Sequence, residues 1–311
     1  MTRRPGGPGL TCALAAIVLS TAATVPLGAQ GLAPTKPELA ASVREHLDRA
    51  LSDRASDPDK EWVRTVFRKS GLPTVKQVGA EAAEDYILLC AHDQPLAFIE
   101  QVAVAVSEVS LRTIPMNARL FLIAQLRQKR AEAAVREPVP LPELRDQIRS
   151  LYVEDQRVRT EHVGDPQLWA PVDARTGVAL RAIFDKYGVP GSSEVGVEAS
   201  RNFVVLVQHQ PSELIKQVLP KLEVQVRLGQ ANPSDYAMMF DRARTSEKRP
   251  QRYGENFECG SDGRLEPSPI EAPEALDARR ASVGLLPMRH YRMLIERMYP
   301  ADFCRNASQT R

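Results

Sequence analysis

The stretch that decides the fold is Leu180–His209, which reads LRAIFDKYGVPGSSEVGVEASRNFVVLVQH. At an offset of 117 residues, Val63–His92 reads VRTVFRKSGLPTVKQVGAEAAEDYILLCAH. Eleven of the thirty aligned positions are identical, and the alignment needs no gap. After one residue is dropped, Phe98–Val102 (FIEQV) also falls on Leu214–Val218 (LIKQV). Because self-similarity over a long period indicates a repeated structural unit, the sequence predicts an internal duplication.

Helical periodicity recurs throughout the second copy. Gly188 and Pro190 are typical of a helix end, and Pro220 marks a kink or a break. The expected helices are Asp173–Tyr187, Val197–Gln208, Ser212–Gly229 and one that starts at Asn232-Pro233. Further helices are expected at Pro37–Arg54, Leu141–Glu161, Pro273–Val283 and Pro287–Met298. No segment shows convincing strand alternation. The chain is therefore predicted to be all-α, with two similar four-helix units in tandem.

The N-terminus has the layout of a secretory signal peptide. Arg3 and Arg4 precede an uncharged apolar run, Leu10–Val25, and small residues follow as far as Ala29, where cleavage is expected. The run is about 16 residues, short of the ~20 that a membrane-spanning helix needs, although an uncleaved anchor is the alternative. No later apolar run is long enough to span a membrane. We therefore expect an exported protein, periplasmic or secreted.

The expected organisation has four parts. They are a signal peptide at 1–29, a first helical unit at 30–136, a second helical unit at 137–257, and an irregular C-terminal extension with two short helices at 258–311. The linker Arg136–Glu143, REPVPLPE, separates the two units. Without Arg3 and Arg4 the formal charge of +2 falls to zero, and no basic stripe remains. This balance argues against nucleic acid and against electrostatic binding to a membrane. A peptide, a glycan or a protein is the expected partner.

Three cysteines lie beyond the signal peptide. Export to an oxidising compartment would allow Cys259 and Cys304 to pair, both in a region rich in Gly and Pro. Cys90 lies in an apolar helical run and is expected in the core. None of the three has metal-ligand spacing, and no cofactor or phosphate-binding motif occurs in the chain, so neither a metal nor a cofactor is expected.

The duplication separates scaffold residues from candidate site residues. His92 and His209 end equivalent helices, where an imidazole can bond the last carbonyls, so a structural role is expected for His209. Residues without a twin are more informative, since Gln208 aligns with Ala91 and neither charge of Asp241-Arg242 recurs. The catalytic candidates are Asp155, His209, Asp241 and Tyr253. The binding candidates are Arg159, Gln208, Arg242 and Gln251.

Each candidate also has a structural interpretation. Asp155 and Arg159 are four residues apart and could pair on one helix face, or EDQRVR (154–159) could be a solvated face. Asp241-Arg242 could be an ion pair that locks a helix. Tyr253 could lie in a turn with a capping hydroxyl. The alternatives stay open, since the sequence does not show whether these side chains meet.

Several stretches, taken in order, resemble a bacterial family known only as a domain of unknown function. They are EDQRVR (154–159), VDARTGVALRAIFDKYGVPGSSEVGVEAS (172–200), LVQH (206–209), DRA (241–243), PQRYG (250–254) and PIEAPEALDARRASVGLLP (269–287). The resemblance covers roughly Leu144–Tyr291, and the first unit looks like a degenerate copy. This resemblance implies an architecture and supplies no activity.

Three departures from the family pattern are visible. Gln210-Pro211 stand where the family has Ala-Asp after the histidine, and Glu255-Asn256 stand where it has Thr-Gln. Arg175 or Thr176 takes the place of a usual Asn. If the family has an active site, these changes count against activity here. We therefore expect a non-catalytic binding or interaction module, with a hydrolase that uses the carboxylate, His and Tyr residues of the second unit as the alternative.

Overall fold

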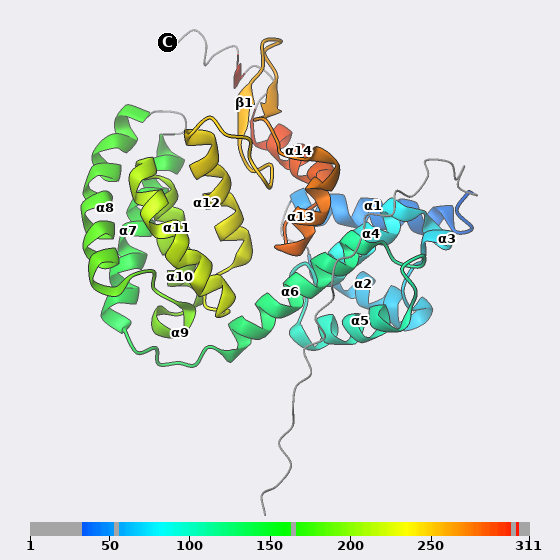
Figure 1. The fold of residues 1–311 in the computed structure, drawn as a ribbon. Coiled ribbons are helices and arrows are strands. Elements are labelled where there is room, and N and C mark those ends of the chain that lie inside the picture. The colour runs from blue at the N-terminus through cyan, green and yellow to red at the C-terminus, as the bar shows by residue number, and fades with distance from the viewer. Residues whose placement is uncertain (1–32, 53–55, 163–165, 300–302, 305–311) are drawn as a thin grey trace, which may run out of the picture. The chain divides into compact units, whose positions relative to one another are not determined.

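The structure is a computed structural model that describes residues 33–52, 56–162, 166–299 and 303–304. The predicted signal peptide lies outside these residues. Nearly all regular structure in the described ranges is α-helical, so the predicted all-α class is confirmed (Figure 1). None of the helices in those ranges is both long and apolar enough to cross a membrane.

Six helices form each half of the helical part. In the first half they are α1 (Pro37–Ser52), α2 (Asp57–Ser70), α3 (Val75–Val78), α4 (Ala80–Ala91), α5 (Leu96–Glu108) and α6 (Met116–Ala134). In the second half they are α7 (Pro142–Glu161), α8 (Pro166–Tyr187), α9 (Ser192–Val195), α10 (Val197–Gln208), α11 (Ser212–Arg227) and α12 (Pro233–Ser246). The two halves agree in helix order, while a duplication as their origin stays a prediction.

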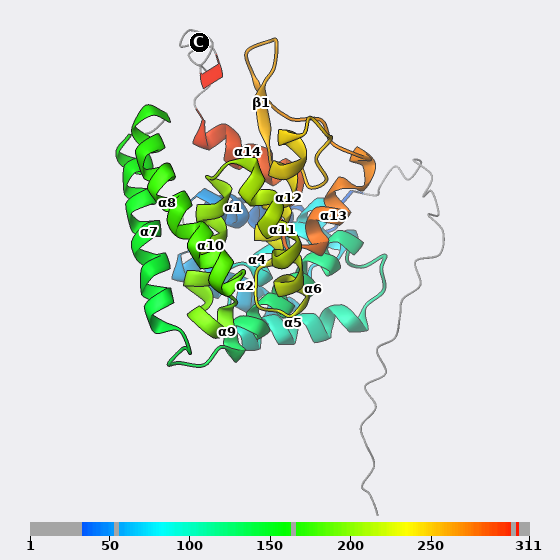
Figure 2. The ribbon, with the colours of Figure 1, turned by 60° about the vertical axis from the view of Figure 1, so that its left-hand side comes forward.

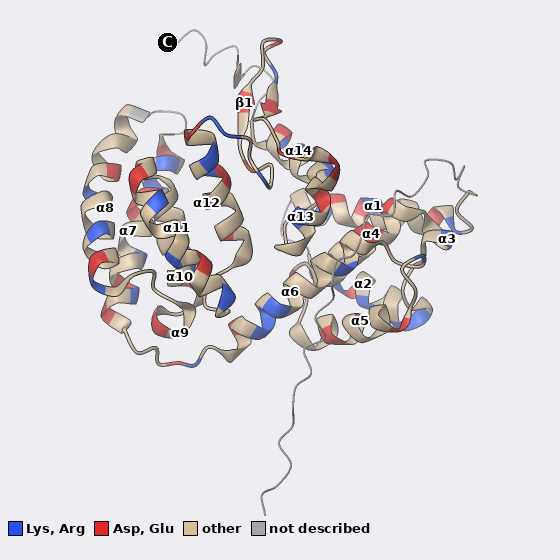
Figure 3. Cartoon of the chain, in the orientation of Figure 1, with Lys and Arg blue, Asp and Glu red and all other residues tan. Residues whose placement is uncertain are grey.

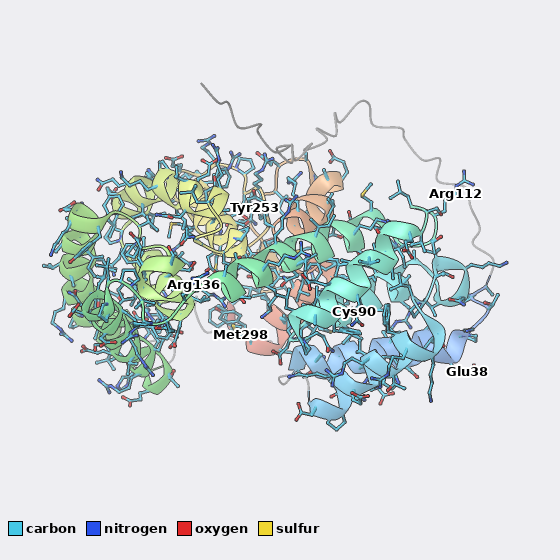
Figure 4. All side chains as sticks on the ribbon, turned by 90° about the horizontal axis from the view of Figure 1, so that it is seen from below. Glu38, Cys90, Arg112, Arg136, Tyr253 and Met298 are labelled. Atoms are coloured by element: carbon cyan, nitrogen blue, oxygen red, sulfur yellow. A yellow bond between two sulfur atoms is a disulfide. The ribbon has the colours of Figure 1, made fainter. Side chains whose placement is uncertain are left out.

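One buried helix organises the core of each half. In the first half α4 packs on α1, α2 and α6, and in the second half α10 packs on α7, α8 and α12. Two hydrophobic clusters result, one built mainly from α1–α6 and one from α7–α12. Tyr86 and Phe203, at equivalent positions of α4 and α10, are both fully buried. Cys90 lies among the helices of the first half and is buried, as expected (Figure 4).

Prolines interrupt these helices less than the sequence suggests. Helix α8 begins at Pro166, ahead of the predicted start at Asp173, and continues through Pro171. Helix α11 runs unbroken through Pro220, so a break there was the wrong expectation. Pro220 is exposed. Water can therefore satisfy the carbonyl that loses its N–H partner, and the helix tolerates the proline.

The C-terminal extension contains two strands that the sequence did not reveal. They are β1 (Phe257–Cys259) and β2 (Leu265–Pro267), which pair in antiparallel fashion. Three residues per strand are too few for an alternation to be recognised. A 3-10 helix (Pro273–Ala275), α13 (Leu276–Ser282) and α14 (Met288–Met298) follow, close to the two predicted helices. A disulfide joins Cys259 to Cys304.

The extension contacts helices of the first half as well. Helix α13 packs against α6. From α14, Arg289 donates to Glu84 at 2.6 Å, and the Nε2 of His290 lies 2.7 Å from a carboxylate oxygen of Asp85. Glu84 and Asp85 are both buried in α4. Ion pairs with buried carboxylates thus attach the last long helix to the first hydrophobic core.

Candidate functional site

The second half brings Asp155 and His209 together. Helix α7 packs along α10, and the two lie side by side in Figures 1 and 2. His209 caps the C-terminus of α10, and its Nδ1 lies 3.0 Å from the Oδ1 of Asp155. The prediction that this imidazole bonds the last carbonyls of its own helix is wrong, because α7 offers a buried carboxylate that is a stronger partner.

Arg159 extends this contact into a network. Its Nε donates to Asp155 at 3.1 Å, which confirms the expected pair four residues apart, and its Nη2 donates to Asp173 at 2.5 Å. Gln156 donates to the other carboxylate oxygen of Asp155 at 2.8 Å. Burial raises the pKa of Asp155, but the bond with His209 and the charge of Arg159 outweigh burial, so its pKa lies below the usual value. Asp155 is therefore held as a carboxylate.

The equivalent histidine of the first half has a different partner. His92 bonds the backbone of Ala50, and burial lowers the pKa of its imidazole. Helices α1 and α7 both open with Pro-Glu-Leu, at Pro37 and Pro142, and this register places Ala50 opposite Asp155. A histidine at this helix end can therefore be held in place without a carboxylate partner. The Asp155–His209 pair is a feature of the second half alone.

His209 also lines an open groove of about 900 Å³ between α8 and the start of α11. Small side chains of α8, Ala170 and Ala174, form part of its wall together with Gly177. Val178 lies on the same wall and is 74% exposed. The wall along α8 is therefore largely small and apolar, with Asp173, Arg181 and Asp185 also lining it, and the groove includes the polar residues that follow α10.

Gln210 is the second polar residue at this end of the groove. It is 7% exposed, and its Nε2 has no hydrogen-bond partner among the described residues. Its Oε1 lies against Gly177, where an added Cβ would come within 2.4 Å of that oxygen. The absence of a side chain at Gly177 is what lets the Gln210 amide pack on α8. Sequence alone marks Gln210 only as a departure from the family pattern.

Asp241, in α12, and Tyr253, in the loop that follows α12, form a separate cluster. The carboxylate of Asp241 accepts backbone N–H bonds from Arg252 at 2.6 Å, Tyr253 at 2.9 Å and Glu255 at 3.1 Å. Burial raises its pKa, although these bonds oppose the shift. The ring of Tyr253 packs edge-on against Phe240, with 6.1 Å between centroids. Asp241 therefore shapes the loop after α12 and makes no ion pair with Arg242.

Gln251 closes the same loop. Its amide donates to the carbonyls of Asn256 at 2.9 Å and Ser268 at 2.8 Å, and it accepts from the Asn256 N–H at 2.8 Å. Every polar atom of this side chain thus has a partner, and the residue is fully buried. Figure 4 shows Tyr253 where this loop meets the C-terminal helices. Gln251 has the contacts of a structural residue.

Two binding candidates remain, Arg242 and Gln208. Arg242 is exposed, and no ion pair with a described residue forms. Desolvation and the charge of Arg159 lower its pKa, so the two guanidinium groups lie near each other. Gln208 is buried, and its Nε2 lacks a partner among the described residues. Gln208 does not line the groove that His209 and Gln210 line.

Residues 161–303 match the model of a family of unknown function, DUF6624. The predicted resemblance of the second half to such a family is confirmed, with a match that starts and ends later along the chain than expected. Neither a curated protein nor a solved structure matches the chain.

The DUF6624 match includes His209, Gln210 and the loop that Asp241 holds, but it begins after Asp155 and Arg159. The histidine thus belongs to the matched region, while its carboxylate partner lies just before it. The described residues contain no group of three or more His, Cys, Asp or Glu side chains that could hold a metal ion.

Within the matched region, sequence reasoning missed a buried ion pair. Arg280 is fully buried and donates to Glu255 at 2.7 Å and to the carbonyl of Tyr253 at 2.5 Å. Its guanidinium also lies 4.6 Å from the ring centroid of Tyr291. Burial raises the pKa of Glu255. In the sequence, Arg280 stood out only as part of the ARRAS segment (278–282) of the resemblance. The ion pair of Arg280 with Glu255 joins the loop after α12 to α13.

Proposed function

We propose that the protein is a non-catalytic binding module and that the groove between α8 and α11 takes a segment of peptide chain from a partner. The groove itself carries the proposal. It is open, about 900 Å³ in volume, and walled along α8 by small side chains. Small residues on an exposed helix face let an incoming backbone approach closely, and an open apolar groove suits an extended or helical segment.

The distribution of the catalytic candidates supports binding over hydrolysis. Two of the four have structural partners away from the groove, Asp241 in α12 and Tyr253 in the loop that follows it. No Ser, Thr or Cys is among the described residues that line the groove, so the usual protein nucleophiles of acyl transfer do not lie there. Lysines, arginines and carboxylates are interspersed over the helices (Figure 3).

A thermal-shift screen of residues 30–311 against short peptides, cell-wall fragments and sugars tests the proposal. Val178→Lys places a positive charge on the groove wall, and Val224→Lys places one on another exposed valine, in α11 and outside the groove. Peptide hits that disappear in Val178→Lys and persist in Val224→Lys are the expected result. Hits that treat both variants alike, or sugar hits alone, would overturn the proposal.

A hydrolase is the second candidate, and the Asp155–His209 contact favours it. A buried carboxylate that accepts from Nδ1 fixes the tautomer of a histidine and leaves Nε2 able to accept a proton from water. The test is product release from any ligand that the screen identifies. Turnover that is lost in His209→Ala would replace the binding proposal by this one.

A further inference from the structure

Two adjacent polar residues at one end of the groove differ in hydrogen-bonding capacity. The Nδ1 of His209 lies 3.0 Å from the carboxylate of Asp155, so in neutral His209 the proton is on Nδ1 and Nε2 is an acceptor. The Nε2 of Gln210 is a donor, buried and without a partner among the described residues. Both residues line the groove, His209 with an acceptor and Gln210 with a donor that is shielded from solvent, so a turn of the Gln210 amide would present this donor to a ligand.

This pair is complementary to an amide group. An amide supplies one N–H for His209 and one carbonyl oxygen for Gln210, whereas a carboxylate has no donor and an ammonium has no acceptor. A buried donor without a partner is unfavourable, so a ligand carbonyl that reaches Gln210 gains from satisfying it. Binding would therefore favour ligands with an accessible amide over charged groups at this end.

The rim of the groove adds a charge preference. Asp185 and Glu213 line it, are exposed, and form no ion pair within the described residues. Asp173 already bonds Arg159 at 2.5 Å, and the one lining arginine, Arg181, donates to Gln217 at 3.0 Å. The two carboxylates without ion pairs are thus complementary to a cationic side chain.

From these contacts we infer that the ligand is a peptide with a basic residue, held by a backbone amide at His209 and Gln210 and by its cationic side chain at Asp185 and Glu213. This inference rests on the proposed function. It adds the chemical class of the ligand and names Gln210 and the rim carboxylates as the residues that select it.

Calorimetric titration with N-acetylated, C-amidated alanine pentapeptides that carry Lys or Glu at the centre tests the inference. The Lys peptide is expected to bind at least tenfold more tightly than the Glu peptide, and the difference is expected to shrink at high salt. A depsipeptide, in which an ester replaces the amide before the Lys, keeps the charge and removes the N–H. It is expected to bind at least fivefold more weakly than the Lys peptide.

Matched glutamine variants test the protein side. Gln210→Leu is expected to weaken the Lys peptide about tenfold, and Gln208→Leu, which removes another buried amide without a partner, is expected to leave its affinity unchanged. Equal affinities for the Lys, Glu and ester peptides, all lost in Val178→Lys, would overturn the inference and leave the proposed function standing. No binding of any peptide would overturn both. The peptide comparisons use the unmodified protein, so they decide the matter even if a variant fails to fold.

Discussion

At the scale of single residues, the two histidines at equivalent helix ends separate structure from function. His92 bonds the backbone of Ala50, and His209 bonds the buried carboxylate of Asp155. Repetition correctly identified both as helix-end residues, but it could not show the partner, because Asp155 lies outside the aligned stretch. The buried charge of Asp155 is stabilised because Arg159 and Gln156 also donate hydrogen bonds to this carboxylate.

Asp155→Asn tests how that carboxylate is stabilised. The charge-assisted bonds to His209 and Arg159 are lost, so the free energy of unfolding is expected to fall by about 2 kcal/mol at pH 7. The folded pKa of Asp155 lies below its unfolded value of about 3.9, so this stabilisation is full above that value and is lost as pH falls through the folded pKa. Urea denaturation from pH 3 to 7 measures it, and a difference that grows toward low pH would contradict the assignment.

At the scale of elements, α10 is the most predictable helix and the loop after α12 the least. Helix α10 begins and ends where the sequence placed it, because Gly196 and the buried apolar run mark both limits. The short helix α9, Ser192–Val195, was not among the expected helices. The contacts of the loop depend on Asp241, Gln251 and Arg280, which converge only through tertiary packing. No local pattern could reveal them.

Asp241→Ala is expected to release this loop. Three backbone N–H groups lose their acceptor, so the variant should lose about 3 kcal/mol of stability. Hydrogen exchange should quicken at Arg252, Tyr253 and Glu255 by more than in α4, whose core amides report only the loss of global stability. Unchanged protection of those three amides would show that the carboxylate is not what holds the loop. Val224→Asp, away from the loop, is the control.

The attachment of α14 to α4 gives a second test at this scale. Asp85 receives bonds from both Arg289 and His290, so Asp85→Ala is expected to cost about 3 kcal/mol. Burial raises the pKa of Glu84, so its ionised form destabilises the folded state at neutral pH. This destabilisation by Glu84 is relieved as pH falls through its folded pKa. Glu84→Gln should therefore change stability by less than about 1 kcal/mol at pH 7. Urea denaturation of both variants checks this, and equal losses would contradict it.

At the scale of the whole molecule, the sequence predicted the disulfide of the C-terminal extension but not the helices that the extension contacts. The sequence predicted that Cys259 and Cys304 could pair, and the structure joins them, while the contacts of α13 and α14 with the first half were not foreseen. Those contacts join residues about 200 positions apart, such as Arg289 and Glu84. No pattern within a single helix encodes such a pairing.

Removal of the disulfide should destabilise the protein measurably. The two cysteines are 45 residues apart, and the chain-entropy model gives about 4 kcal/mol for a loop of this length. Cys259→Ser with Cys304→Ser is therefore expected to lower the midpoint of urea denaturation. A reductant should lower the midpoint of the wild type to the same value and leave the double variant unchanged. A reductant effect on the double variant would point to Cys90 instead.

Peptide binding in the groove between α8 and α11 can be followed by methyl NMR of residues 30–311 during titration with the alanine pentapeptide that carries a central Lys. We expect shifts for Ala170, Ala174, Val178 and Leu214 in the groove, with Val224 and Leu228 unchanged. Shifts that avoid the groove methyls, or no shifts at millimolar peptide, would contradict peptide binding in the groove.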